Sequence, residues 1–537
     1  MRRRDLVVAL ILLIFLFMGS VVGETAPGKN SKEIVQASEI LTTIERGQPV
    51  VYDGVIVEGD LYLNGMTLDS VHFNKTIFNG SVNFQKANFS GDAWFSEANF
   101  SKDIISEYAV FSGTKANFES AQFGGYADFK KAQFIGLANF YNATFSSKAV
   151  FDMARFECDL CQDTSFYKAF FAGDANFYEV NFSSRANFGN AQFKQKAVFN
   201  KAYFSDGANL ANAQFFEAAN FKETQFGGDL NSESANFSGN VNFKDASFSG
   251  DVSFKKTKFY NDVEFINNTF HSSAEFEEII SAAGCSFNES KFDETADFSG
   301  SIFDRSANFK EAAFLGDAHF DKSTFNEMVN FEDARFPEYA FFEDVNFTDT
   351  SRIRLDRARY EKLLLHWEDV TYDNPLRWSD DVKLEFDSEV YLKLIKNYRE
   401  LGWFEDANEC YYYFMKLRPY DSDMRIYSII LKYIYGFGTK PMRPIGISIG
   451  IILSFALIWD YYYREDIKST KFRDSLNFSI RLFLSGTKLS IEPPEYKPVP
   501  ATGFLERNLF EIERVAASIL FFFFLFAASA SLLIKIT

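Results

Sequence analysis

The chain has little of several residue types that common functional sites require. Only four cysteines and four histidines occur among its 537 residues, with 11 prolines and 30 glycines. The few cysteines exclude a disulfide-rich scaffold, and the four histidines supply few ligands for a His-rich metal site. The low proline and glycine content does not match a collagen-like or a proline-rich disordered chain. The net charge is -18. Binding to a nucleic-acid backbone needs basic patches, so nucleic acid is not an expected partner.

Motifs for catalysis are also missing from the sequence. We find no Gly-rich phosphate loop, no metalloprotease motif, and no Ser, His and Asp arrangement that the periodicity described below does not already explain. The sequence therefore predicts a protein that is not an enzyme, with no catalytic, cofactor-binding or metal-binding residues.

Phenylalanine is abundant, with 66 copies, and it is periodic. Two interleaved series, starting at Phe166 and Phe171, each recur at every eleventh position, so successive spacings alternate between five and six. From Phe166 to Phe347 this register holds 34 positions, of which 31 are Phe. The exceptions are Leu210, Ser232 and Ser281. Earlier blocks in other registers run from Phe73 to Phe111 and from Phe118 to Phe156.

The residues around each Phe are also regular. A small residue stands two positions before it, and the residue between is usually polar, as in Ala186-Asn187-Phe188. In an α-helix, steps of five and six residues would place the two Phe series on nearly opposite sides, which argues against a helical coil. A β-solenoid explains the pattern, because Phe and the small residue face inward and Phe stacks on Phe about 4.8 Å away in the next coil.

This pattern resembles the pentapeptide-repeat family in its Phe-centred form. Residues 186–188, 191–193 and 197–199 carry the resemblance. It covers the stretch of the chain from Phe73 to Phe347. It implies an all-β, right-handed quadrilateral β-helix with about 22 residues per coil, or roughly 12 coils between residues 73 and 347. We expect the repeat domain at 71–350 and an N-terminal cap at 24–70, with a helix over 32–47 and strands from Val50.

Both ends of the chain carry apolar segments. Residues 1–23 combine a basic start, an apolar core from Leu6 to Met18 and small residues, which is typical of a secretory signal peptide; an uncleaved N-terminal anchor is the alternative. Either one places the following residues outside the cytoplasm. Residues 445–463 and 515–536 are each nearly long enough to span a bilayer, with buried core helices as the alternative.

Lysine and arginine predict the orientation of these spans. Residues 464–514 hold nine of them, whereas the stretch 425–444, directly before the first span, holds four. Because the more basic loop usually stays in the cytoplasm, we expect 464–514 inside and the repeats outside. The predicted location is the cell membrane, with the repeat domain extracytoplasmic.

The segment 351–440 departs from the Phe period. Tyr391 to Met415 has apolar residues at helical spacing on both sides of Gly402, which predicts a helical hairpin that looks like a single tetratricopeptide unit. Such repeats are normally stable only when several stack. We therefore interpret it as a spacer or C-terminal cap in preference to a peptide-binding groove.

Two further runs, at 394–407 and 435–443, resemble archaeal membrane proteins that join pentapeptide repeats to a two-helix, ion-channel-like end. That resemblance implies a transmembrane region at 441–537 with a degenerate pore-like loop. The residues of this loop are Ser485, Gly486, Thr487 and Lys488. With one Gly and a Lys, the loop departs from a potassium filter, while Gly436-Phe437-Gly438 looks like half a filter but precedes the first span.

Two other features allow several interpretations. Cys158 and Cys161 lie where the Phe register slips, and they fit plain packing, a local disulfide, or metal or redox chemistry. Residues 261–350 carry a net charge of -15, which fits a solvated face or divalent-cation binding.

Together these observations predict a non-enzymatic, membrane-anchored scaffold or binding protein that presents an extended β-helical surface outside the cell. The alternative is an ion-channel-like membrane protein whose β-helix acts as a sensor or assembly domain. The expected partners are the lipid bilayer and a protein, either a second copy of the chain or an unidentified one.

Overall fold

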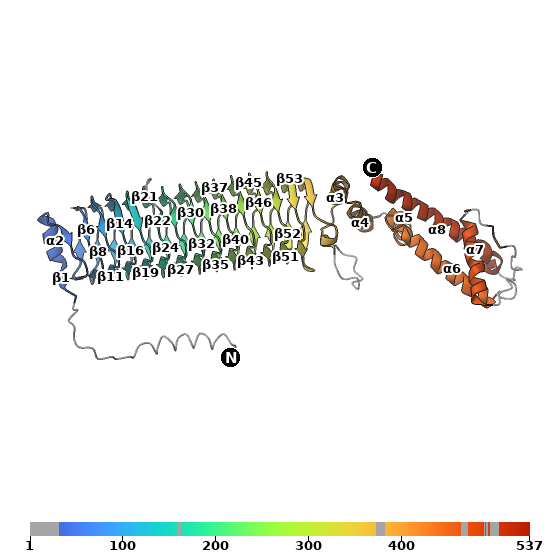
Figure 1. Cartoon of the computed structure of the whole chain (residues 1–537), viewed down its shortest axis with the longest axis horizontal. Helices are drawn as coiled ribbons and strands as arrows, with labels where there is room; N and C mark the ends of the chain where they lie inside the picture. The colour runs from blue at the N-terminus through green and yellow to red at the C-terminus, as the bar shows by residue number, and fades with distance from the viewer. Residues whose placement is uncertain are drawn as a thin grey trace, which may run out of the picture.

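The computed structural model describes residues 32–158, 163–371, 382–420, 422–462, 471–487, 489, 492–494 and 504–536. A β-solenoid of about 15 turns forms one half of an elongated molecule, and helices follow it at the C-terminal end (Figure 1). The predicted signal peptide or N-terminal anchor at 1–23 lies outside the described residues.

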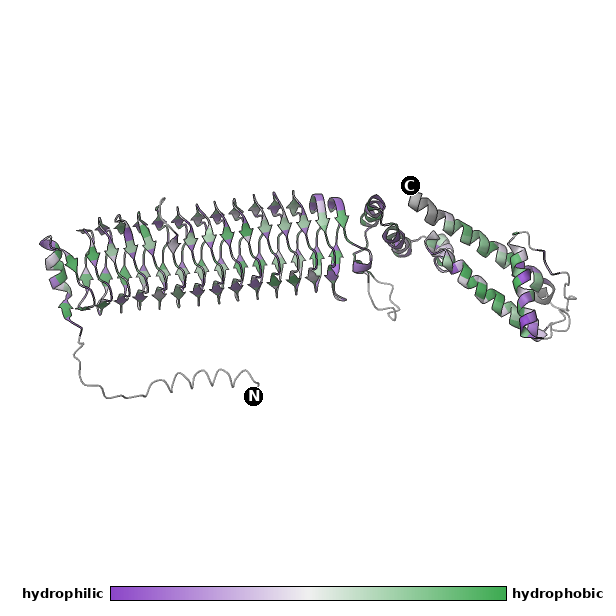
Figure 2. Cartoon of the chain, in the orientation of Figure 1, coloured by the Kyte–Doolittle hydropathy of each residue, from purple (hydrophilic) through white to green (hydrophobic). Residues whose placement is uncertain are grey.

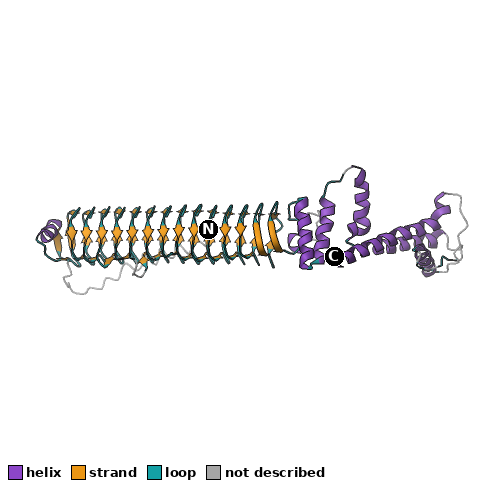
Figure 3. Cartoon of the chain, turned by 90° about the horizontal axis from the view of Figure 1, so that it is seen from above, coloured by secondary structure: helices purple, strands orange, loops and turns teal. Residues whose placement is uncertain are grey.

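One coil of the solenoid consists of four short strands. A typical coil contains β23 (Phe170–Phe171), β24 (Ala175–Asn176), β25 (Asn181–Phe182) and β26 (Ala186–Asn187). Each strand pairs in parallel with the strand four positions later, so that Phe171 lies beside Phe193 and Phe182 beside Phe204. Figure 3 shows the strands stacked along the axis of the rod.

The pairings form four ladders along the rod. Two are separate sheets of 15 and 14 strands, and the other two merge into a 27-stranded sheet. The merger is at β53 (Arg335–Phe341), which pairs with both β49 (Ala313–Phe314) and β50 (Ala318–His319). The strands of each coil therefore form backbone hydrogen bonds with the strands of the coil before it. Along its described length, the rod has no long unpaired strand edge.

Phenylalanine fills the interior as predicted. The rings of Phe177 and Phe199 stack with centroids 4.9 Å apart and planes 2° apart, and Phe254 and Phe309 are fully buried. The small residue two positions earlier is also buried, as at Ala197. Full burial of each Phe contributes roughly 1.5–3 kcal/mol, so the stack is the main source of stability in the rod.

The alternation of five and six residues reflects two kinds of corner. After each Phe of the Phe166 series the chain turns tightly: the N–H of Ala169 donates to the carbonyl of Phe166 at 3.0 Å, and Lys168 between them has φ 59°. The same position in almost every coil has positive φ, although it is usually not glycine. This tight turn corresponds to the spacing of five, and the corner after the Phe171 series corresponds to the spacing of six.

Asparagine at the centre of the Ala-Asn-Phe unit braces the tight corner. The side-chain oxygen of Asn187 accepts the N–H of Gly189 at 3.0 Å and the side-chain amide of Asn209, from the next coil, at 3.1 Å. Asn308 makes the equivalent bond with the N–H of Lys310 at 3.1 Å. These asparagines are half-buried.

The Phe register changes at two insertions in the sequence, and the ladders of paired strands continue past both. Asn99 pairs with Gln122, where the regular spacing would place Ala121, and the shift reflects one extra residue before Phe118. Phe145 pairs with Phe171, where the regular spacing would place Tyr167, and this larger shift reflects the insertion before Phe166. The solenoid is thus continuous through both insertions.

The ladders begin earlier than residue 71, where we expected the repeats to start. Strand β1 (Ile34–Gln36) pairs with β3 (Ile56–Glu58), and α2 (Ala37–Glu45) covers the first coil with Ile40 fully buried. The expected helix over 32–47 is therefore shorter, because Ile34 pairs as a strand residue with its side chain 61% exposed.

The last coil ends at β56 (Arg359–Leu364), beyond the expected boundary at 350, and the predicted hairpin covers it. The hairpin is formed by α3 (Ser388–Leu401) and α4 (Phe404–Leu417), joined at Gly402 with φ 76°. The buried side chain of Asn397 accepts the N–H of Leu363 at 3.1 Å and donates to its carbonyl at 2.8 Å. One hydrophobic core runs from the Phe stack into the hairpin, so the hairpin is a C-terminal cap.

Four helices follow the cap: α5 (Ser422–Tyr435), α6 (Met442–Tyr462), α7 (Phe472–Gly486) and α8 (Phe504–Ile536). A 3-10 turn, η2 (Gly436–Gly438), joins α5 to α6. Figure 2 shows that α6 and α8 are apolar over most of their length, while α7 has both polar and apolar residues. Of the described helices, α6 alone is long and apolar enough to count as a candidate membrane span, where we had expected two spans.

Candidate functional site

The predicted pore-like loop lies at the end of α7, against α8. Ser485 and Gly486 are the last residues of α7, and Thr487 follows with its hydroxyl bonded to the carbonyl of Leu484 at 2.6 Å. A side chain at Gly486 would lie 2.3 Å from the backbone oxygen of Arg514, so glycine permits a close crossing of α7 and α8. The fourth predicted residue, Lys488, lies outside the described residues.

A buried carboxyl group joins three helices near this crossing. Glu513 of α8 is fully buried and accepts hydrogen bonds from the indole N–H of Trp459 in α6, at 2.9 Å, and from the hydroxyl of Ser479 in α7. Ser475 of α7 donates to Asp460 of α6 at 2.9 Å. These bonds fix α7 across one end of the α6–α8 pair.

The outer surfaces of α6 and α8 are apolar. Only 17% of the most apolar 18-residue stretch of α6 is buried. Large apolar side chains of both helices are exposed: Ile449, Leu453, Leu457, Val515, Ile519, Phe522, Leu525 and Phe526. Together these side chains form an exposed apolar surface on the pair of helices, of the kind that marks an interaction site for a protein or a membrane.

A junction between the cap and the helices surrounds a cavity of about 740 Å³. Trp367 and Asp406 line its cap side, and Lys440 and Arg443 line its helical side. Lys440 forms an ion pair with Glu409 of α4. This contact links the rigid end of the solenoid to the start of α6.

Three groups in the cap form a neighbouring polar cluster. His366 stacks on Trp403 with ring centroids 4.0 Å apart, and its Nδ1 lies 2.9 Å from Asp406. Nearby, burial raises the pKa of Asp369 to about 6. The cluster anchors η1 (Glu368–Val370) to the hairpin.

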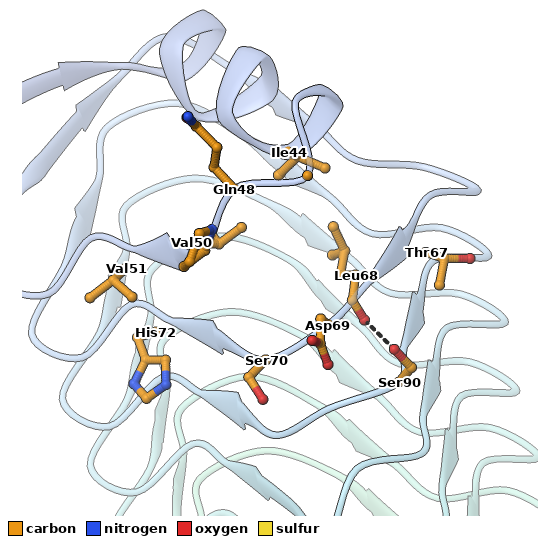
Figure 4. A pocket seen from close by; sticks show the side chains of 12 residues that line it. Ile44, Gln48, Val50, Val51, Thr67, Leu68, Asp69, Ser70, His72 and Ser90 are labelled. Carbon is orange, nitrogen blue, oxygen red and sulfur yellow. Dashed lines mark hydrogen bonds between the residues drawn. The ribbon is translucent and has the colours of Figure 1, made fainter.

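A second hollow, of about 460 Å³, lies beside the N-terminal cap. Figure 4 shows Gln48 and Ile44 on its cap side and His72, Ser70 and Asp69 on the coil below. The hydroxyl of Ser90 donates to the carbonyl of Leu68 at 3.0 Å. His72 stacks on Trp94, with centroids 6.2 Å apart, so its ring belongs to the outer stack of the rod.

The remaining candidate residues are distributed along the rod. Cys158 is disulfide-bonded, which fits one of the three interpretations of this pair, and Cys161 lies outside the described residues. Cys285 and Cys410 are free and buried. Acidic side chains of 261–350 form ion pairs such as Arg305–Glu327 at 2.6 Å. Within the described residues, no three His, Cys, Asp or Glu side chains form a group that could hold a metal.

The structure defines the class of the rod: a β-solenoid with four short strands in each coil. A family model for pentapeptide repeats (9 copies) matches residues 54–104, 233–280 and 309–352. The solenoid is thus a pentapeptide-repeat domain. Comparison with curated proteins and with solved structures gives no match.

One surface was not anticipated from the sequence. Helix α5 exposes six large apolar or aromatic side chains: Met424, Ile426, Tyr427, Ile429, Ile430 and Tyr433. Their spacing carries a helical signal, because Ile426, Ile429, Ile430 and Tyr433 recur at intervals of three and four residues. That signal could have revealed an amphipathic helix directly before the first predicted span.

Proposed function

We propose that this protein is a membrane-anchored, non-enzymatic scaffold that presents its pentapeptide-repeat rod outside the cell. The observation that carries the proposal is the placement of apolar surface. The rod and both caps bury most of theirs and expose single residues such as Leu392, whereas α6 and α8 expose apolar faces along their described length. Burying those faces in a bilayer offsets the cost of leaving them in water, at about 25 cal/mol per Å².

The proposal includes both C-terminal helices as spans. The 21 residues of α6 are enough to cross the hydrocarbon core of a bilayer, and α8 has 33. Figure 1 shows the two helices side by side, with α7 at the end remote from the rod. If both helices span, α7 and the basic residues around it lie on the opposite side of the membrane from the rod.

Three observations support an extracytoplasmic rod. The basic segment 464–514 favours the cytoplasmic side for the α7 end, and the start of the chain has the composition of an export signal. Cys158 is in a disulfide, a bond that persists mainly in oxidising compartments. We also propose that the four ladders form a right-handed coil of quadrilateral section, as in the family that the repeat resembles.

The rod itself supplies a surface for a protein partner. Its coils are rigidly stacked, and its outward residues vary from coil to coil, as at Lys168, Glu179 and Asn190. Such a surface binds by presenting side chains at fixed intervals, and it needs no catalytic group. The ion-channel-like alternative draws on the Lys440–Glu409 contact, which could transmit a change in the rod to α6.

Topology decides between these functions. In intact cells, with native cysteines replaced, a membrane-impermeant thiol reagent should modify Gln195→Cys, on an exposed part of the rod, and leave Ser490→Cys unmodified. Labelling of Ser490→Cys alone would place the rod in the cytoplasm and contradict the proposal. Unitary, ion-selective currents from the full chain in a planar bilayer would favour the channel-like alternative.

A further inference from the structure

Helix α5 has an apolar face that nothing in the described structure covers. Ile426 is 70% exposed, Tyr433 65%, and Ile429 51%. At about 100° per residue, Ile426, Ile429, Ile430 and Tyr433 fall within a stripe roughly 100° wide. We call these four residues the α5 stripe.

The stripe faces away from the rest of the molecule. On the opposite side of α5, Tyr435 is buried and stacks on Phe523 of α8, with ring centroids 5.1 Å apart. Leu431 lies on that same side, one turn earlier. The helix is therefore held in place by one face and has a separate face free to meet another medium.

The chain bends sharply between α5 and α6. Gly436, Phe437 and Gly438 have φ of 61°, 55° and 94°, three successive left-handed conformations that only glycine adopts at low cost. Figures 1 and 3 together show α5 running across the direction of α6 and α8. If α6 crosses a bilayer, a helix that runs across it at its end lies along the membrane surface.

Basic residues accompany the stripe. Arg425 and Lys432 lie on α5 beside it, and Lys440 and Arg443 follow the bend. The guanidinium of Arg443 donates to the carbonyl of Lys432 at 2.7 Å, which joins the end of α5 to the start of α6. An anionic membrane surface attracts basic residues that lie close to it.

We propose that α5 is an interfacial helix, with its stripe inserted at the boundary between headgroups and acyl chains of an anionic bilayer. This inference rests on the proposed membrane anchoring by α6. An apolar stripe, flanking cations and a position directly before a span are together the properties of helices that lie in the membrane interface. The consequence is that the rod is held at a fixed angle to the membrane instead of hanging from a flexible linker.

A fluorescent depth measurement tests the inference. The full chain, with Cys158 and Cys161 replaced by Ser and Cys285 and Cys410 by Ala, is placed one copy per nanodisc. An environment-sensitive fluorophore is attached at Ile430→Cys on the stripe. Leu392→Cys is the matched control, because Leu392 is also apolar and 52% exposed but lies on the cap. Leu453→Cys on α6 reports whether that helix is in the bilayer.

In nanodiscs with anionic lipid, a spin label near the lipid headgroups should quench position 430 about twofold or more and leave position 392 unchanged. Replacing the anionic lipid with a neutral one should reduce the quenching at 430. A spin label deep in the acyl chains should quench position 453 most strongly.

The outcomes separate the two proposals. Quenching at 453 without quenching at 430 overturns the interfacial role of α5 and leaves membrane anchoring standing. No quenching at 453 contradicts the anchoring itself. A blue-shifted but unquenched fluorophore at 430 means that the stripe packs against protein, which also overturns the inference.

Discussion

The rod and the C-terminal helices are both rich in phenylalanine, but they place it differently. Phe309 in the rod is fully buried, while Phe522 in α8 is 64% exposed. The rod buries most of its apolar side chains between its own coils, away from water. The C-terminal helices expose their apolar side chains on the outer surface, so the stability of these helices depends on the surrounding medium. The same residue type thus forms a buried core in the rod and an exposed apolar surface on the C-terminal helices.

The largest expected effect comes from comparing two Phe→Ala substitutions, one in the rod and one in α8. Phe309→Ala removes a ring from the stack and leaves a cavity, so we expect it to lower the local free energy of unfolding by about 3–5 kcal/mol. Phe522→Ala in the same detergent-solubilised chain should change it by less than about 0.5 kcal/mol. Hydrogen exchange at the neighbouring amides measures both. Equal effects would contradict the burial difference.

The C-terminal cap gives the next largest expected effect. Asn397→Ala leaves the buried N–H and carbonyl of Leu363 without partners, which should cost about 2–3 kcal/mol. Exchange protection should fall in β56 first, because that strand ends the ladder. Lys396→Ala, a neighbouring change on the exposed side of α3, serves as the control and should leave protection unchanged.

A smaller effect should appear as a pH dependence of the cap. Burial raises the pKa of Asp369 from 3.8 to about 6, so the folded cap favours the protonated carboxyl. Its contribution to stability is complete below about pH 4 and is lost as the pH rises through 6, by about 1 kcal/mol after allowing for partial solvent screening. Urea titrations followed by tryptophan fluorescence should show this loss. Asp369→Asn should remove it; an unchanged slope would place the titration on another group.

The smallest effect concerns the tight corners of the rod. Ser234 has φ 58°, a conformation that asparagine tolerates better than serine. Ser234→Asn should raise the melting temperature slightly, by the equivalent of about 0.5 kcal/mol. Ser238 does not have this backbone conformation, so Ser238→Asn is the control. A gain at 238 and none at 234 would contradict the role of the corner.

The rod was predictable because each coil repeats the same information. The Phe register predicted the inward positions and the ring stacking, and the resemblance to pentapeptide repeats implied the length of each coil. The exceptions Leu210, Ser232 and Ser281 are inward as well. The end coils were harder to recognise. They use other apolar residues, such as Val57, Leu61 and Leu68, so the Phe period does not mark them.

The remaining features depend on contacts between distant residues. No local pattern shows that Asn397 pairs with the backbone of Leu363, in an earlier element of the chain. Gly486 belongs to the predicted pore-like loop, and its close contact with Arg514 becomes visible only when α7 and α8 are placed together. The α5 stripe was readable from its spacing, but its exposure depends on how α5 packs against α8.

Because each coil contacts only the coils beside it, the length of the rod is independent of its two caps. Duplicating the residues of any one coil would lengthen the stack by one layer and displace the far end by about 4.8 Å. The added coil would make the same kinds of contact as the existing coils. Gene duplication can therefore change the distance between the two ends of the rod in small and equal steps.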